Sequence, residues 1–186
     1  YSMLNILKPI LPIKELDVIE SISKMKELRN NIFSENISEN NQALQIANWL
    51  PDIPVIYYPL GLESAAIRFK NSLQENAKMH VITEDVIEAC HNGIVSWSKP
   101  STVIKPIMIR GIDDYVKTQE RWVILKDYFK NMGIDYKEIF SYSGSILTKI
   151  INLIYLLDYS TIYKAVSLEI DPTPVKAINY VKERSG

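Results

Sequence analysis

The spacing of apolar residues along the N-terminal part of the chain predicts helices and no strand. Between residues 13 and 32, apolar side chains return every three or four positions, which indicates an amphipathic helix. The stretch at 34–41 is polar and loop-like, and a second, short helix is expected at 43–50. Pro51 and Pro54 then interrupt the helical pattern.

After Pro54 the pattern changes to short β-prone runs that alternate with helices, an order typical of a parallel sheet. Pro106 lies inside the third run, so that strand is predicted to be an edge strand or irregular. The sequence therefore predicts an α/β fold, a three-layer αβα sandwich with a mostly parallel sheet of four or five strands, preceded by a helical connector. The predicted strands are at 55–58, 79–83, 102–111 and 134–140; the predicted helices are at 62–78, 116–133 and 145–168, with a short one opened by residues 171–175.

Composition narrows the class of protein. The chain has 186 residues, 47% of them hydrophobic and 23% charged, which fits one globular domain. The formal net charge of −1 provides no long-range field for nucleic acid or an anionic membrane. The longest apolar run, at 146–157, contains Lys149 and Asn152 and is too short to span a bilayer. One cysteine excludes an internal disulfide, no signal peptide is visible, and we expect a cytoplasmic protein.

Glu75 lies near the end of the helix predicted at 62–78, roughly opposite its apolar side. One interpretation is a solvated glutamate paired with Lys78, three positions later. The other is that Glu75 belongs to a site, because a carboxylate in the last helical turn opposes the helix dipole at a cost of roughly 0.3–1 kcal/mol. The pattern leaves both interpretations open.

The two histidines of the chain, His80 and His91, and its only cysteine, Cys90, follow closely after Glu75. His91 precedes an Asn-Gly turn, so it is either an exposed residue at a helix end or an imidazole available for proton transfer near neutral pH. The spacing of the three side chains matches no common zinc pattern, and we expect no metal site. Cys90 and His91 are neighbours, which point apart on a helix, and this argues against a nucleophile pair.

The segment SYSGS at 141–145 follows a predicted strand and opens a predicted helix. Its hydroxyl groups, including that of Ser143, either cradle a phosphate at the helix N-terminus or form an ordinary N-cap. Farther on, Asp171 and Pro172 have the residue types of an N-cap and a first helical position. In the helix that they would open, Val175, Ile178 and Val181 are expected to face inward, with Lys182 on or near the opposite side.

Three blocks of the sequence, at 53–78, 87–99 and 141–182, together resemble the C-terminal half of the bifunctional phosphoglucose/phosphomannose isomerases of archaea and some bacteria. These enzymes belong to the sugar isomerase (SIS) superfamily, and the resemblance runs from about Ala43 to Lys182. It implies a C-terminal SIS domain at 45–186 after an interdomain connector at 1–44. It also implies a homodimer that interconverts glucose 6-phosphate or mannose 6-phosphate with fructose 6-phosphate through a cis-enediol, without a cofactor.

The resemblance also assigns site residues. Glu75, in the QENAK segment, corresponds to the base that moves a proton between C1 and C2 of the sugar. His91 corresponds to the histidine of the family's HNE motif, which opens the sugar ring and comes from the partner subunit. Lys182 corresponds to a lysine at the sugar oxygens. Three further residues are expected to contact substrate: Asn92, Arg68 and Ser143.

Some features depart from the family pattern. The HNE motif reads His91-Asn92-Gly93, without its carboxylate, and Ile87 stands where the family usually has proline. No SxSGxT-like phosphate loop lies upstream of Ala43, so we expect this chain to be a C-terminal half that is inactive without the first SIS domain, its partner in the same protein. The alternative is a non-catalytic SIS module that binds a sugar phosphate or has a regulatory role.

Overall fold

The computed structural model describes residues 2–7 and 9–185 and contains a parallel sheet of four strands in the order β2-β1-β3-β4. Each helix between two strands carries the chain back along the sheet, as the alternating pattern predicted. The α/β class and the parallel sheet are therefore confirmed. The strands are β1 (Ile53–Tyr58), β2 (Ile82–Asp85), β3 (Ile104–Arg110) and β4 (Lys137–Phe140).

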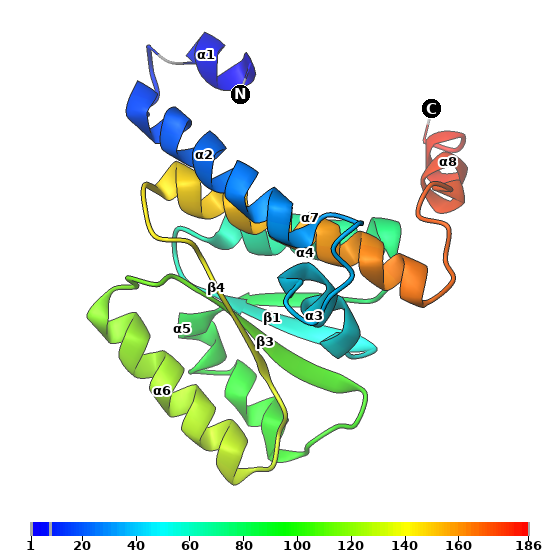
Figure 1. Ribbon diagram of the computed structural model, residues 1–186. Coiled ribbons are helices and arrows are strands. Elements are labelled where there is room, and N and C mark those ends of the chain that lie inside the picture. The colour runs from blue at the N-terminus through cyan, green and yellow to red at the C-terminus, as the bar shows by residue number, and fades with distance from the viewer. Residues whose placement is uncertain (1, 8, 186) are drawn as a thin grey trace.

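Helices cover both faces of the sheet and complete three layers (Figure 1). One layer contains α2 (Glu15–Ile32), α3 (Gln42–Trp49), α4 (Glu63–Asn76) and α7 (Ile146–Ser167). The other contains α5 (Val86–Ala89), the 3₁₀ helix η1 (Gly93–Ser98) and α6 (Val116–Asn131). Two short terminal helices, α1 (Ser2–Leu7) and α8 (Lys176–Lys182), stand outside the layers (Figure 1). Within residues 2–7 and 9–185, no helix has the length and apolar character needed to cross a membrane.

Alternation along the strands divides the interior into two cores. Ile56 and Ile107 point toward the layer with α7, whereas Tyr57 and Met108 point toward the layer with α6. All four side chains are at most 1% exposed. Burial on both faces is the usual condition of a parallel sheet, and it explains why these strands read as nearly continuous apolar runs.

Helix α7 is apolar on nearly all sides because it packs against three other helices, α2, α3 and α4. Leu153, Leu156 and Leu157 are fully buried in this layer. Burial within one chain therefore accounts for most of the apolar surface of α7. The homodimer that the family resemblance implies stays a prediction.

The second strand begins later than predicted. A strand was expected at 79–83, but β2 begins at Ile82. The preceding residues instead close helix α4: Lys78 adopts a left-handed conformation with φ of 56°, and the Met79 N–H donates to the Leu73 carbonyl at 3.3 Å. This helix termination uses the residues that the apolar pattern had assigned to the strand.

The prediction that the strand containing Pro106 is an edge strand or irregular is wrong, because β3 is the third of four strands and pairs on both sides. The proline is tolerated because β4 joins β3 only from Ile107 onward. At Pro106 the strand has β1 as its one neighbour, where Pro106 stands opposite Val55. The missing N–H thus falls where no β4 residue requires it.

The helix expected to open at Asp171 and Pro172 begins instead at Lys176. The Asp171 carboxylate accepts a hydrogen bond from the Thr173 N–H at 2.9 Å, which forms a local turn rather than a helix cap. Ile178 and Val181, expected to face inward, are 44% and 60% exposed, and no described residue of α8 is buried. The expectation was wrong because α8 has no layer to pack against.

The predicted connector is joined to the rest of the fold through α2. Leu28 and Ile32 of α2 are buried in the core around α7. Nearer the start of α2, the Glu20 carboxylate accepts hydrogen bonds from the Ser145 N–H at 2.9 Å and the Thr148 hydroxyl at 2.7 Å, so it caps the start of α7. The boundary between residues 44 and 45 stays a prediction.

The close approach of Glu20 requires a glycine at residue 144. The backbone of Gly144 has φ of 130°, and a Cβ there would lie 2.7 Å from Glu20 Oε1. Glu20 thus hydrogen-bonds to Ser145 and Thr148 and lies close to Gly144. These three contacts fix the start of α7 against α2.

We expect Glu20→Gln to lower the melting temperature at pH 7. The hydrogen bonds from Ser145 and Thr148 lower the pKa of Glu20 in the folded protein. The carboxylate therefore contributes stability above its unfolded pKa of about 4.3, and this contribution is lost as the pH falls through the folded pKa. Calorimetry from pH 7 to pH 3 should show a difference between wild type and variant that closes with acidification.

The matched control is Glu27→Gln on the same helix, where the carboxylate forms an exposed pair with Lys24. Such surface pairs contribute little, so the melting temperature should hardly change. Equal melting temperatures for wild type and Glu20→Gln at pH 7 would show that the cap does not stabilise the fold.

Candidate active site

Glu75 lies one residue before the end of α4, where this helix has returned to the amino ends of the strands. Polar contacts with α7 hold α4 in place. Arg68 donates to both oxygens of Asp158 at 3.0–3.3 Å, and the Ser72 hydroxyl donates to Asp158 at 2.7 Å. The position of Glu75 is therefore fixed by the packing of two helices.

Lys78 connects the end of α4 with the segment that leads to α8. Its ammonium group donates to the carbonyl of Glu75, to that of Pro174 at 2.8 Å and to that of Pro172 at 3.4 Å. It thus satisfies a carbonyl at the helix C-terminus and holds the proline-rich segment against α4. The Glu75–Lys78 side-chain pair considered from the sequence is not formed, because the lysine binds backbone oxygens.

A cavity of about 390 Å³ lies between α4 and the segment before α8. Its volume falls in the range of small-molecule sites. The Glu75 side chain is exposed at this cavity and accepts no hydrogen bond from the residues that the structure describes. The cavity therefore presents a carboxylate beside a fixed ammonium group. Its lining residues are Gln74, Glu75, Lys78, Asp171, Pro174, Val175, Lys176, Ala177 and Ile178.

His91 lies just after α5, which follows β2 directly. Asp85 caps this helix by accepting hydrogen bonds from the N–H groups of Ile87 and Glu88 at 2.9 and 3.2 Å. His91 itself is exposed, and its N–H donates to the Glu88 carbonyl at 2.9 Å. The side chain of Asn92 donates to the Glu88 carboxylate. Short-range contacts thus shape this corner and leave the imidazole accessible.

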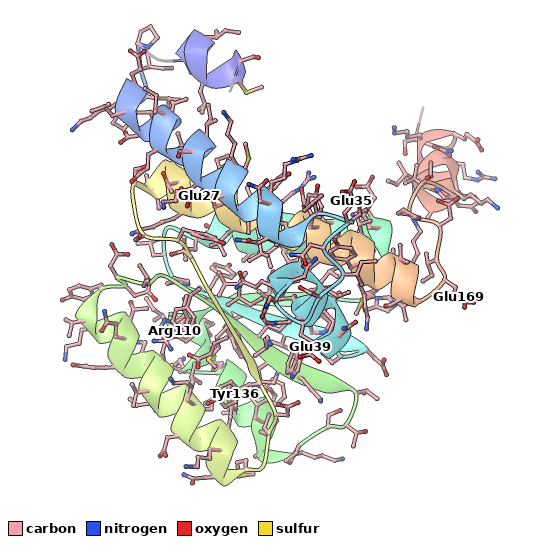
Figure 2. All side chains as sticks on the ribbon, in the orientation of Figure 1. Glu27, Glu35, Glu39, Arg110, Tyr136 and Glu169 are labelled. Carbon is pink, nitrogen blue, oxygen red and sulfur yellow. The ribbon has the colours of Figure 1, made fainter. Side chains whose placement is uncertain are left out.

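One chain does not bring Glu75 and His91 together. Parallel strands end at one edge of the sheet, so α5 and His91 lie at the carboxyl ends, whereas the returning helix α4 places Glu75 at the amino ends. In Figure 1, α5 and α8 lie on opposite sides of the molecule. Figure 2 shows the same separation between Arg110, the last residue of β3, and Glu169, just before the cavity segment.

Lys182 does not line the cavity, although its helix begins there. Lys176 and Ile178 of α8 are part of the lining, but Lys182 is the last residue of that helix. It is exposed and lies roughly 9 Å along the helix axis from Lys176, at 1.5 Å per residue. Glu75 lies next to the first turn of α8, and the role of Lys182 at the sugar oxygens stays a prediction.

The remaining predicted substrate contacts have different surroundings. Arg68 is occupied by its bidentate pair with Asp158. Ser143 is exposed in the loop before α7, and the N-cap is Ser145, whose Oγ accepts from the Thr148 N–H at 3.3 Å. Because Glu20 also occupies this helix start, the geometry is that of a cap, one of the two interpretations of the SYSGS segment.

A smaller cavity, of about 150 Å³, lies at the carboxyl ends of β1 and β3 and was not foreseen from the sequence. From β1 the chain continues to β2 on one side of the sheet, and from β3 it continues to β4 on the other. The crevice between two such strands is a usual place for ligands in open α/β sheets. Burial raises the pKa of Asp114 there, and its carboxylate accepts from Trp122 Nε1 at 2.8 Å and the Gly111 N–H at 3.0 Å. Lys149 pairs with Asp113. The feature of the sequence that could have indicated this cavity is the Gly-Ile-Asp-Asp segment directly after β3.

The residues that sequence reasoning missed at the larger cavity are Lys78, in its bridging role, and Asp171. No local pattern reports the contact between Lys78 and this segment, because the carbonyls of Pro172 and Pro174 lie far along the chain. Within the described part of the chain, no three His, Cys, Asp or Glu side chains gather as a metal site would require.

Comparisons with known proteins agree with this architecture. Residues 39–184 match the family model described as the bacterial phospho-glucose isomerase C-terminal SIS domain. The bifunctional phosphoglucose/phosphomannose isomerase of Caldicellulosiruptor bescii is 29% identical over 189 residues, covering 99% of this chain and 55% of that protein. The enzyme of the same name from Aquifex aeolicus is 29% identical over 157 residues, covering 80% of this chain and 49% of that protein.

Among solved structures, a glucose-6-phosphate isomerase like protein from Thermus thermophilus has the same fold. Its TM-score is 0.68 at 17% identity, and the alignment covers 89% of this chain and 56% of that chain. The chain thus spans about half the length of the curated relatives that it matches. Since the family model covers most of the residues, the chain belongs to the family of bacterial phospho-glucose isomerase C-terminal SIS domains.

Proposed function

We propose that this chain is the C-terminal half of an aldose–ketose isomerase that interconverts glucose 6-phosphate and mannose 6-phosphate with fructose 6-phosphate through a cis-enediol. The observation that carries the proposal is the Glu75 carboxylate, unpaired among the described residues, at a cavity of ligand size beside the fixed ammonium group of Lys78. The names of the curated relatives support this substrate class.

In this mechanism Glu75 acts as the general base and moves a proton between C1 and C2 of the open-chain sugar. The negative charge that develops on the sugar oxygen requires positive charge nearby. Lys182 is proposed to provide it, which requires α8 to approach the cavity, since none of its described residues is buried. Lys78 and Lys176 already contribute positive charge at the cavity wall.

His91 opens the sugar ring as an acid–base group, and we propose that it acts in the site of a partner subunit. Its location supports this: His91 is exposed at the sheet edge opposite Glu75. A two-fold homodimer that places the carboxyl edge of one copy against the Glu75 cavity of the other would form two composite sites. Asn92 accompanies His91 in this arrangement.

The phosphate group is proposed to bind mainly to the first SIS domain. The start of α7, the candidate for a phosphate cradle in this chain, is already capped by the Glu20 carboxylate. A second anion there would meet repulsion rather than free donors. The isolated chain is therefore expected to be inactive, and the complete cytoplasmic protein active.

The alternative function is a non-catalytic SIS module that binds a sugar phosphate. Gly93, which removes the carboxylate of the HNE motif, favours it. It differs from the isomerase proposal in one measurable respect: the complete protein would bind fructose 6-phosphate and produce no glucose 6-phosphate or mannose 6-phosphate.

We expect Glu75→Gln, in the full-length gene product that carries this chain, to reduce kcat by roughly 10²–10⁴-fold, the usual contribution of a general base. The amide keeps the shape of the side chain but cannot accept the carbon-bound proton at neutral pH. KM should change little, because the lost interaction belongs to the transition state. Steady-state rates with fructose 6-phosphate would measure both constants.

Glu39→Gln provides the matched control, since it makes the same change at an exposed residue outside the cavity lining, in the loop before α3, the helix that leads to the amino end of β1. Its kcat should equal that of wild type. Unchanged turnover in Glu75→Gln would remove Glu75 from the role of base.

The composite site predicts complementation between two inactive variants. Glu75→Gln and His91→Ala homodimers each lack one group in both sites, but a mixed dimer contains one site with neither substitution. After unfolding and refolding of an equal mixture, half of the dimers are mixed, so roughly a quarter of wild-type activity should return. Activity that stays at the sum of the separate variants would place both residues in one chain's site.

A further inference from the structure

The carboxylate of Glu84 lies where a side chain at residue 93 would begin. A Cβ added to Gly93 would be 2.2 Å from Glu84 Oε2 and 3.3 Å from Oε1. Glycine leaves room for this carboxylate, and a larger residue at 93 would displace it from this place. The Glu84 carboxylate therefore lies beside Gly93, two residues after His91, although Glu84 belongs to strand β2.

Strand pairing determines the direction of the Glu84 side chain. Glu84 stands opposite Tyr57 of β1, so both side chains point to the face of the sheet that η1 covers. The Trp97 indole of η1 donates to the Tyr57 hydroxyl at 2.7 Å, which holds η1 over this face. Burial raises the pKa of Tyr57 to about 12, and the charge of Glu84 contributes to the rise. Gly93, the first residue of η1, is thereby held against the Glu84 carboxylate.

Two of the three neighbouring carboxylates have a structural role, and Glu84 has none among the described residues. Asp85 caps α5, and Glu88 accepts from Asn92. Glu84 is partly buried, yet it accepts no hydrogen bond from any residue in the described part of the chain. Partial burial and the charges of Glu88 and Asp85 raise its pKa. A partly buried carboxylate without a partner is unfavourable for folding, and such groups gather at functional sites.

We propose that Glu84 provides, from strand β2, the carboxylate that the family's HNE motif would place at residue 93. It is a positioning residue: it accepts a hydrogen bond within the assembled site and thereby orients the His91 corner for opening of the sugar ring. A glutamate at 93 would displace the Glu84 carboxylate, because its Cβ would lie 2.2 Å from the present position of Glu84 Oε2. This inference rests on the proposed isomerase function and explains how the function is compatible with Gly93.

The test exchanges the carboxylate between the two positions in the full-length gene product. Glu84→Gln, which keeps the shape, should retain the melting temperature and KM but reduce kcat by about 10–100-fold, part of the roughly 10²–10⁴-fold that a positioned acid–base group contributes. Gly93→Glu alone should lower kcat, because the new side chain displaces the Glu84 carboxylate from its place. The double variant Glu84→Ala/Gly93→Glu should recover kcat to within a few-fold of wild type.

Glu84→Ala/Gly93→Gln is the matched control, since it fills the same space without a charge. It should remain as slow as Glu84→Gln. If both double variants recover equally, or if Glu84→Gln turns over like wild type, Glu84 only fills space and the inference is overturned. A wild-type protein without isomerase activity would overturn the proposed function itself, and this inference with it, so the two failures are distinguishable.

Discussion

The burial of helix α7 is the constraint on which the rest of the structure depends. This helix of 22 residues packs against α2, α3 and α4, and its leucines form the centre of the larger core. Its few polar side chains then determine the register of its neighbours. Asp158 holds Arg68 and Ser72, and the Thr161 hydroxyl accepts from Asn76 at 2.8 Å. The apolar surface supplies the free energy, and the polar contacts between the two helices select one alignment of α4 on α7.

Both ends of α7 have consequences for the site. Its start is fixed by Glu20, whose carboxylate already occupies this helix N-terminus. At its end, Glu169 adopts φ of 56° and the Ile170 N–H donates to the Ala165 carbonyl at 2.9 Å. This termination directs the chain across the end of α4, where Lys78 binds the carbonyls of Pro172 and Pro174. The Glu75 cavity thus results from the way two helices end beside each other.

The sequence allowed the layered fold and the position of Glu75 to be predicted, because both depend on local periodicity. Strands buried on two faces give apolar runs, and a carboxylate on the polar side of α4 is visible in the helical spacing. The start of β2, the tolerance of Pro106 and the exposure of α8 were mispredicted, because each depends on a neighbour in space. Lys78 was interpreted as a partner of the Glu75 carboxylate, whereas its acceptors include carbonyls 94 and 96 residues later.

The contact between Glu84 and Gly93 belongs to this second, non-local class, and it changes how a missing motif residue is understood. From the sequence, Gly93 counts as the loss of a carboxylate. In the structure the glycine permits the approach of another carboxylate from β2. Glu20 and Glu84 have opposite surroundings. Donors surround Glu20 and lower its pKa, whereas burial and like charges raise that of Glu84. A carboxylate with a raised pKa binds a proton more readily, which suits Glu84 to the proposed role of accepting a hydrogen bond that orients the His91 corner.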